Sequence, residues 1–330
     1  EAKGDLLVSL GGGSTTDGGK AVTICLKHGI SDIDGMEAYR TVVDETGKRH
    51  FPEYDAPDVR QIVVPTTLSA GEFNARAGVT NSALRLKQSF VHPGIIPISV
   101  ILDPAVTLRT PEWLFLSTGI RAVDHAVETY LSIDANAYYD GACLQALRLL
   151  GEGLPRVKAD PGDLDARLKC LMGAWMSMTG IIAGARLGAS HAIGHILGGS
   201  AGVPHGHTSC IMLPYVLEWN AAVNGERQKE IATAMGRAGT PASEVLDGFI
   251  RNHQGFGRSC KKIDTDPAVE LSLCFGNIGV SWPDKHIDGG NALGAQSHRC
   301  HRLHTSDHIN RICTPHRLSC DDSVRGFALV

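Results

Sequence analysis

Short apolar runs alternate with longer amphipathic stretches along the first hundred residues of the chain. Three of these runs predict strands: Leu6–Leu10, Ile62–Val64 and Ile98–Leu102. Between the first two runs, the residues from Thr16 to about His28 predict a helix. Strands separated by helical or loop segments are typical of a parallel sheet. The pattern therefore predicts an α/β fold for this part of the chain.

From about residue 110 the apolar spacing becomes helical. Thr110-Pro111-Glu112 offers a capping hydroxyl, a proline suited to a first turn and an acid at the positive end of a helix. Apolar residues then recur at helical spacing up to Tyr130, from an expected start at Ser117 or Thr118. Further helices are expected over 137–151, 165–197 and 209–222. The pattern predicts an α/β part over 1–109 and an all-α domain over 110–250.

The end of the chain loses both periodicities. Residues 251–330 hold 7 of the 15 histidines and 5 of the 9 cysteines. A zinc module is one interpretation, but such modules repeat paired ligands at C-x₂-C or H-x₃-H spacing, and this stretch does not. We expect an atypical, poorly ordered tail over 251–330, as a frameshifted or mispredicted gene end would produce.

Composition narrows the classes of function. The chain has 330 residues, of which 43% are hydrophobic and 20% charged, as is normal for a folded protein of two domains. The net charge of −4, without a basic stripe, gives no reason to expect nucleic acid. No apolar run reaches the roughly 18 residues of a membrane span. Nucleic acid and membrane are therefore not expected as partners.

The first residues and the cysteines bear on completeness and compartment. The chain begins with neither a methionine nor a signal peptide and passes at once into the strand Leu6–Leu10. We therefore expect that its true beginning, with a first strand–helix unit, is missing. Nine cysteines show no secreted framework, so a reducing, cytoplasmic setting is expected.

Glycines and hydroxyl residues follow two of the expected strands. The run from Gly11 to Lys20, GGGSTTDGGK, joins the first strand to the first helix. Glycines let the backbone approach a pyrophosphate, and free N–H groups at a helix start bind it, although a plain tight turn explains the run equally well. The loop Pro65–Phe73 follows another strand, and its hydroxyls suit the ribose or phosphate of the same cofactor.

Histidines gather in the helical part. His191 and His195 share one helix face at i, i+4, His205 and His207 follow a glycine-rich loop, and His125 lies on an earlier helix. A single histidine on an apolar face is usually a packed core residue, whereas a group beside glycines favours a site. Three histidines can hold a catalytic metal with one position open.

Taken in this order, the motifs resemble those of the iron-containing alcohol dehydrogenases. The family pattern G-G-G-S-x-x-D-x-x-K is met from Gly11 to Lys20, and the pattern H-x₃-H followed by P-H-G is met from His191 to Gly206. The resemblance covers about residues 5 to 245. It implies a dehydroquinate synthase-like architecture, NAD(H) or NADP(H) as cofactor, and a homodimer. The cofactor contacts that it implies are Gly11, Gly12, Gly13, Ser14, Asp17, Lys20, Thr66 and Thr67.

One position departs from the metal-binding members of the family. They carry an aspartate four residues before the histidine that corresponds to His125, and this chain has Arg121 there. Arginine cannot ligate a cation, and its charge opposes metal binding. Asp124 is no obvious substitute, because adjacent helix positions point about 100° apart. Maleylacetate reductases also depart from this aspartate, and the segments 69–73 and 121–128 look like theirs.

The chemistry agrees with this branch of the family. Hydride reduction of a carbonyl or a polarised C=C bond needs positive charge where negative charge develops. We expect Arg121, His125 and His195 to supply it, and a guanidinium also suits a substrate carboxylate. The alternative for Arg121 is a surface salt bridge with Glu128 or Asp124.

The leading hypothesis is an NAD(P)H-dependent reductase of maleylacetate or a similar oxo-dicarboxylate, active in the breakdown of aromatic compounds. The first alternative is an alcohol dehydrogenase in which His125, His191 and His205 bind Fe²⁺ or Zn²⁺. The second is an inactive or binding-only remnant of a broken gene. The sequence does not decide between NAD(H) and NADP(H), because the residue that contacts the ribose 2′-position belongs to the section expected to be missing.

Overall fold

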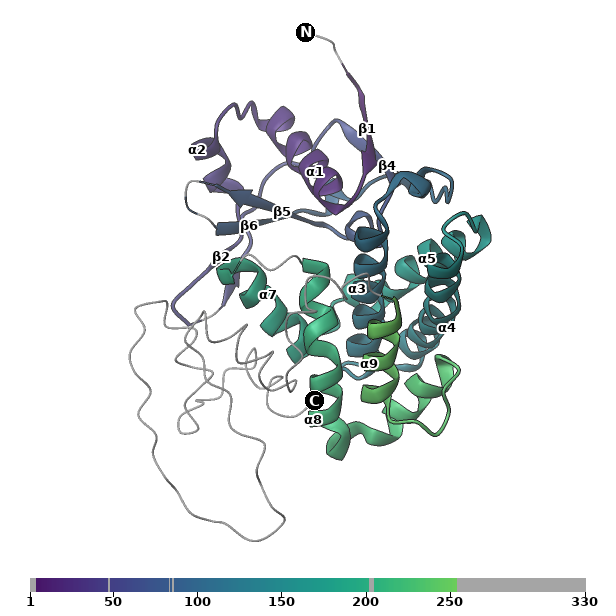
Figure 1. Cartoon of the computed structure of the whole chain (residues 1–330). Coiled ribbons are helices and arrows are strands. Elements are labelled where there is room, and N and C mark those ends of the chain that lie inside the picture. The colour runs from purple at the N-terminus through teal and green to yellow at the C-terminus, as the bar shows by residue number, and fades with distance from the viewer. Residues whose placement is uncertain (1–3, 47, 83, 85, 202–204, 254–330) are drawn as a thin grey trace. The chain divides into compact units, whose positions relative to one another are not determined.

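The computed structural model describes residues 4–46, 48–82, 84, 86–201 and 205–253, all within one compact unit of the chain. An α/β part is followed by a helical part (Figure 1). The strands are β1 Leu6–Gly11, β2 Val42–Val43, β3 Arg49–His50, β4 Arg60–Pro65, β5 Arg76–Asn81, β6 Leu86–Val91 and β7 Ser99–Val100. The helices are α1 Gly13–His28, α2 Ile33–Met36, α3 Glu112–Tyr130, α4 Ala137–Ala159, α5 Leu164–Ser177, α6 Thr179–Ile182, α7 Ala189–Ala201, α8 His205–Ala234 and α9 Ala242–His253.

The three predicted strands form one parallel sheet in the order β1-β4-β7. Val8 pairs with Ile62, and Ile62 pairs with Ser99 on its other side. Helix α1 connects β1 to the rest of the sheet and packs on both β1 and β4. It begins at Gly13, three residues before the predicted start, and ends at His28, where the cap residue Gly29 has a φ of 66° that suits glycine. The predicted α/β class is therefore confirmed.

A second, antiparallel ribbon was not predicted. Strands β5 and β6 pair along their whole length, from Arg76 opposite Val91 to Asn81 opposite Leu86. Phe90 of this ribbon is buried against Ile24 of α1. The ribbon therefore rests on the face of α1 and closes a small core of its own.

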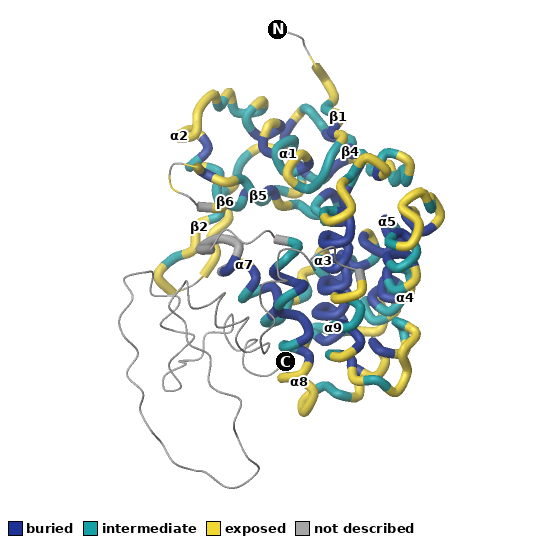
Figure 2. Tube along the Cα trace, in the orientation of Figure 1, coloured by how far each residue is buried: buried dark blue, intermediate teal, exposed yellow. Residues whose placement is uncertain are grey.

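Helix α3 is the central element of the helical part. Every residue from Phe115 to Tyr130 is buried, which Figure 2 shows as a dark blue column. The helix begins at Glu112, earlier than the predicted Ser117 or Thr118. The hydroxyl of Thr110 does not cap it, because it donates to the carbonyl of Thr66 at 2.7 Å. This bond ties the start of α3 to the loop after β4.

The other helices are confirmed with changed bounds. The stretch predicted as one helix over 165–197 divides into α5, α6 and α7, and Gly184 at φ 95° lies in the break before α7. Helix α8 runs beyond the predicted 209–222 and contains a kink at Asn224. Helix α9 was not predicted. The tail expected over 251–330 lies outside the described residues, apart from 251–253 at the end of α9.

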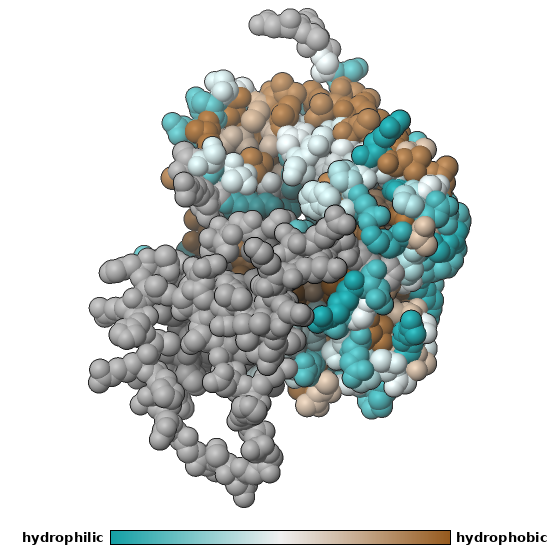
Figure 3. Space-filling view, in the orientation of Figure 1, coloured by the Kyte–Doolittle hydropathy of each residue, from teal (hydrophilic) through white to brown (hydrophobic). Residues whose placement is uncertain are grey.

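Among the described residues, no helix is both long and apolar enough to cross a membrane. Exposed apolar surface gathers over the α/β part in Figure 3. The large exposed apolar side chains of β1 and α1 are Leu6, Val8, Leu10, Val22 and Leu26.

Candidate active site

The glycine turn and the loop after β4 lie against each other. Thr66 donates its N–H to the carbonyl of Gly11 at 2.9 Å. A Cβ atom on Gly12 would lie 2.8 Å from Thr67 Cγ2, and one on Gly13 would lie 2.7 Å from Ser69 Oγ. A side chain at either glycine would therefore have to displace Thr67 or Ser69. The structure thus brings together the two loops for which the sequence predicted a common cofactor.

Helix α1 begins directly in this turn and leaves donors free for a ligand. Gly12 is its N-cap residue, and no side chain caps it. The first N–H groups of a helix have no carbonyl partner inside the helix and attract phosphate. Gly13 and Ser14 belong to that first turn. The geometry fits the pyrophosphate of a dinucleotide.

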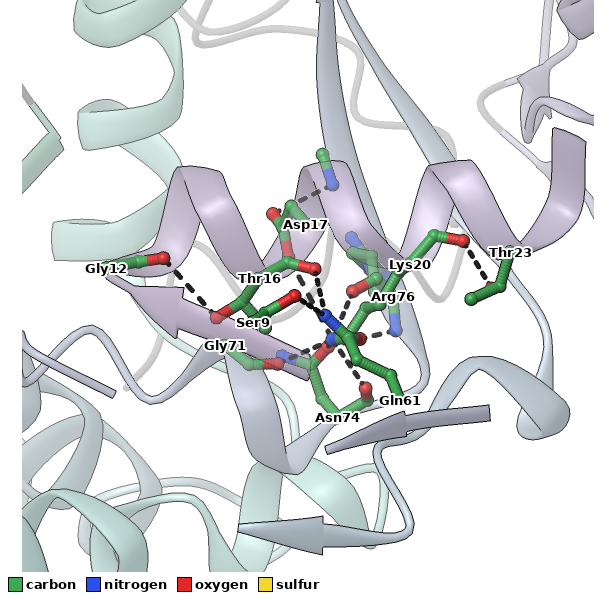
Figure 4. Close-up of polar contacts among 11 residues, drawn as sticks. Ser9, Gly12, Thr16, Asp17, Lys20, Thr23, Gln61, Gly71, Asn74 and Arg76 are labelled. Atoms are coloured by element: carbon green, nitrogen blue, oxygen red, sulfur yellow. Dashed lines mark hydrogen bonds and ion pairs between the residues drawn. The ribbon is translucent and has the colours of Figure 1, made fainter. Parts of the chain in front are cut away.

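Lys20, at the end of the same motif, is fully buried and directed at backbone carbonyls (Figure 4). Its ammonium donates to Gly71 O at 2.6 Å, Asn74 O at 2.9 Å and Arg76 O at 2.9 Å. Burial lowers the pKa of Lys20 to about 8, against the opposing charge of Asp17. The three donors of Lys20 therefore hold the segment between β4 and β5.

Asp17, one turn before Lys20, holds strand β5, which follows that segment. Its Oδ2 accepts the N–H of Gly78 in β5 at 2.9 Å, and its Oδ1 lies 3.9 Å from the Lys20 ammonium. Both charged residues of the motif thus serve internal contacts in the described part of the chain. Their predicted contact with a cofactor stays a prediction.

Arg121 lies inside the protein and not on its surface. Its guanidinium donates to Ser209 Oγ at 2.8 Å and forms an ion pair of 4.0 Å with Asp124. Both side chains are at most 4% exposed. The salt bridge considered in the sequence therefore exists with Asp124, but it is buried. Burial lowers the pKa of Arg121 and raises that of Asp124, and their attraction opposes both effects.

His191 is held by Glu128, one turn after Asp124 on α3. Its Nδ1 lies 2.6 Å from Glu128 Oε2 and 3.4 Å from Asp124 Oδ2. Asp124 is engaged by Ser190, whose hydroxyl donates to it at 2.9 Å. Burial lowers the pKa of His191 and raises that of Glu128, so it favours the uncharged imidazole, while the N–H groups of Ser190 and His191 lower the pKa of Glu128 and favour its carboxylate.

Of the other predicted histidines, His125 and His195 lie beside His191. The ring of His125 stacks on that of His191 with centroids 4.9 Å apart, and the ring of His195 meets it edge-on at 6.4 Å. His195 is exposed. His205 opens α8, and its side chain lies outside the described residues. The predicted catalytic residues Arg121, His125 and His195 thus lie around His191.

Sequence reasoning overlooked the two acids of α3 as members of this site. The sequence analysis considers both acids as salt-bridge partners of Arg121, and it sets Asp124 aside as a substitute metal ligand. Their i, i+4 spacing places them on one helix face, and this spacing was the available signal. The structure shows that this face contacts His191 and Ser190 of α7.

A divalent cation does not fit between Asp124, Glu128 and His191 Nδ1 while these groups keep their present contacts. Asp124, Glu128 and His191 are grouped with candidate ligand atoms within 4.8 Å of one another. However, both Glu128 oxygens accept backbone N–H groups of 188–191, and His191 Nδ1 is bonded directly to Glu128. Arg121 adds a fixed positive charge beside Asp124. A cation at this place would have to break these contacts.

A glycine turn between a parallel strand and a helix is typical of dinucleotide-binding proteins. Comparison with known families agrees. The sequence pattern of the family described as "Iron-containing alcohol dehydrogenase" matches residues 1–104. That of the "Fe-containing alcohol dehydrogenase family, C-terminal" matches residues 115–259. The chain belongs to the iron-containing alcohol dehydrogenase family.

Relatives of both expected kinds are similar to the chain. The maleylacetate reductase of Rhizobium sp. (strain MTP-10005) is 34% identical over 240 residues, 72% of this chain and 59% of that protein. The NAD-dependent methanol dehydrogenase of Bacillus methanolicus is 30% identical over 262 residues, 77% of this chain and 65% of that protein. The chain thus spans about three fifths of the length of the curated relatives it matches.

Solved structures agree with the predicted architecture. The structure of an iron-containing alcohol dehydrogenase from Thermococcus thioreducens has a TM-score of 0.68 at 25% identity, over 84% of this chain and 70% of that one. The predicted fold class, an α/β part followed by a helical domain, is confirmed.

Proposed function

We propose that the protein is an NAD(P)H-dependent reductase of maleylacetate or a similar oxo-dicarboxylate. The observation that carries this proposal is Arg121, which stands at the position of the family's metal-binding aspartate and is buried beside the histidines. A buried guanidinium in that place gives the cluster a permanent positive charge. Such a charge favours an anionic substrate and the negative charge that develops in reduction.

The influence of Arg121 on its neighbours supports this role. Desolvation lowers the pKa values of His191 and His195, and the positive charge of Arg121 adds to the effect on both. The guanidinium therefore acts on the cluster through its field, with Ser209 and Asp124 fixing its position. The rings of His125 and His195 lie beside that of His191, with centroids 4.9 and 6.4 Å away, and are the proposed donors toward the substrate.

NAD(P)H supplies the hydride when it is bound. We propose that Gly11–Ser14 receive its pyrophosphate and that Thr66 and Thr67 contact it from the opposite loop. Asp17 and Lys20 serve the same site by holding the segment after that loop. In this proposal residues 1–109 bind the cofactor and residues 110–250 bind the substrate. A homodimer and a reducing, cytoplasmic setting accompany the proposal.

One observation favours a second function, that of a metal-dependent alcohol dehydrogenase. A histidine whose Nδ1 is held by a carboxylate, with Nε2 directed elsewhere, is the usual arrangement of a metal-bound imidazole. His191 has this arrangement with Glu128. In this alternative, His125, His191 and His205 would hold Fe²⁺ or Zn²⁺ without the family's aspartate.

Turnover measurements separate the two functions. The purified protein is assayed with NADH and NADPH against maleylacetate and against primary alcohols and aldehydes, before and after chelator treatment. We expect maleylacetate reduction that survives chelation. Arg121→Ala should reduce it by about 10- to 150-fold, as expected for the loss of a charge-assisted contact of about 1.5–3 kcal/mol.

Arg167→Ala is the matched control. Arg167 is another buried arginine of the helical part, bonded to Thr107 O at 3.0 Å and outside the histidine cluster. It reports what the loss of a buried guanidinium does to folding alone. Preference for an alcohol, with activity abolished by chelation, would overturn the proposal in favour of the metal-dependent function.

A further inference from the structure

A carboxylate of α3 caps the first turn of α7. Glu128 Oε1 accepts the N–H of Ser190 at 2.7 Å, and Oε2 accepts those of Gly188 at 3.1 Å and His191 at 3.2 Å. The first N–H groups of a helix lack partners within the helix and favour an anion. Glu128 therefore supplies, from a different helix, the acceptor that the start of α7 requires.

The same carboxylate holds the imidazole of His191. Glu128 Oε2 lies 2.6 Å from His191 Nδ1. Three backbone N–H groups already donate to Glu128, which therefore acts as an acceptor. In the fourth bond, between Glu128 and His191, the proton accordingly belongs to Nδ1. In a neutral imidazole the other nitrogen then carries a lone pair. That nitrogen, Nε2, is buried and has no hydrogen-bond partner among the residues that the structure describes.

Among the groups around the His191 ring, Glu128 makes the contact that fixes its orientation. His125 stacks on one face with an interplanar angle of 26°, and His195 stands at 87° to the ring. Besides Glu128, the charges that act on the ring are those of Asp124 and Arg121. Asp124 lies 3.4 Å from Nδ1, farther than Glu128 at 2.6 Å, and it accepts the hydroxyl of Ser190 instead.

We propose that Glu128 is a positioning residue: it joins the start of α7 to α3 and fixes His191 with its proton on Nδ1. His191 Nε2 is thereby presented as a hydrogen-bond acceptor for an O–H or N–H group of a ligand at the histidine cluster. The consequence for turnover rests on the proposed function, whereas the position of the proton does not.

Glu128→Gln reverses the polarity of this one bond. With its NH₂ group in the place of Oε2, the amide donates to Nδ1 and leaves the ring proton on Nε2. Its oxygen then still accepts the N–H of Ser190, whereas the N–H groups of Gly188 and His191 lose their acceptor. Nitrogen-15 NMR of histidine-labelled protein distinguishes the two tautomers. We expect the Nδ1–H form of His191 in the natural protein and the Nε2–H form in the variant. Maleylacetate reduction should fall about 10- to 100-fold, as for other groups that orient a functional histidine.

Two further variants separate positioning from folding. Gly188→Ala changes no functional group, but its Cβ would lie 2.8 Å from Glu128 Oε1 and displace the carboxylate. Gly141→Ala is its control, because no atom lies within 4 Å of that Cβ. Asp163→Asn changes a carboxylate to an amide at the cap of α5, where Asp163 accepts the N–H of Ala166 at 2.9 Å. Gly188→Ala should lower turnover, and both controls should leave His191 unchanged.

Several outcomes overturn the inference. They are an Nε2–H ring in the natural protein, ring signals and turnover that are unchanged in both Glu128→Gln and Gly188→Ala, or a changed ring with undiminished turnover. If Glu128→Gln does not fold, Gly188→Ala carries the test, and unchanged turnover and ring signals in that variant overturn the inference. The predicted tautomers in a protein that does not reduce maleylacetate support the placement of His191 while contradicting the proposed function.

Discussion

Replacement of Lys20 by methionine tests the role that the structure assigns to the charged end of the glycine motif. Methionine keeps most of the side-chain volume but has no donor. The carbonyls of Gly71, Asn74 and Arg76 would lose their shared ammonium, which now lies 2.6–2.9 Å from each. Asp17 would lose the cation 3.9 Å away. The segment between β4 and β5 should loosen as a result.

The size of the effect follows from these contacts. A hydrogen bond to a charged group contributes about 1.5–3 kcal/mol, but the three bonds share one donor group whose own burial is unfavourable. Removing one partner from a buried charged network costs about 3–5 kcal/mol. Lys20→Met should lower the free energy of unfolding by that amount, a large share of the roughly 5–15 kcal/mol of a typical domain.

Denaturant unfolding followed by circular dichroism measures the loss, and hydrogen exchange locates it. Lys27→Met, on the same helix, is the control, because Lys27 pairs at 2.9 Å with Asp58, which is 78% exposed. Such a pair contributes about 0–1 kcal/mol. Faster exchange in Lys20→Met should be confined to the segment around 71–78 and its neighbours. Equal, small losses in both variants would refute the structural role of Lys20.

Two other changes test the α/β part. Gly13→Val should weaken NADH and NADPH binding at least about 10-fold, because even its Cβ would lie 2.7 Å from Ser69 Oγ. Gly18→Val is the control, because a Cβ at Gly18 meets no atom within 4 Å. Equal titration curves for the two variants would remove the glycine turn from the cofactor site. Burial raises the pKa of Glu72 from 4.5 to about 7, so the folded state binds the extra proton, and its stabilising effect is lost as pH rises from about 4.5 to 7. Glu72→Gln should remove about 3 kcal/mol of this pH-dependent loss in the free energy of unfolding. An unchanged dependence of that free energy on pH would contradict the burial of this carboxyl.

The parts of the fold that could be predicted are those whose signal is local. The β-branched run at Ile62–Val64 and the glycines at Gly11–Gly13 predicted a strand and a turn, and both are present. The β5–β6 ribbon could not be predicted in this way, because side chains of α1 hold it from a distance. Asp17 bonds to Gly78 N and Lys20 to Arg76 O.

The candidate site was predicted only in its outline. Motif order pointed to Arg121 and the histidines, and the structure gathers Arg121, His125 and His195 around His191. Motif order did not show that Glu128 caps α7, since this contact spans 60–63 residues of sequence. Nor did it show that Lys20 is enclosed by carbonyls. Contacts between distant segments depend on how helices pack, which a single sequence does not display.

The metal content of the purified protein tests the central claim most directly. Natural protein and Arg121→Asp are each incubated with Fe²⁺ or Zn²⁺, passed through a desalting column and analysed by mass spectrometry for bound metal. The account predicts far less than one metal per chain in the natural protein and a gain toward one in Arg121→Asp, because the aspartate completes the family's ligand set. One tightly held metal per chain in the natural protein, lost together with activity on chelation, would contradict the account.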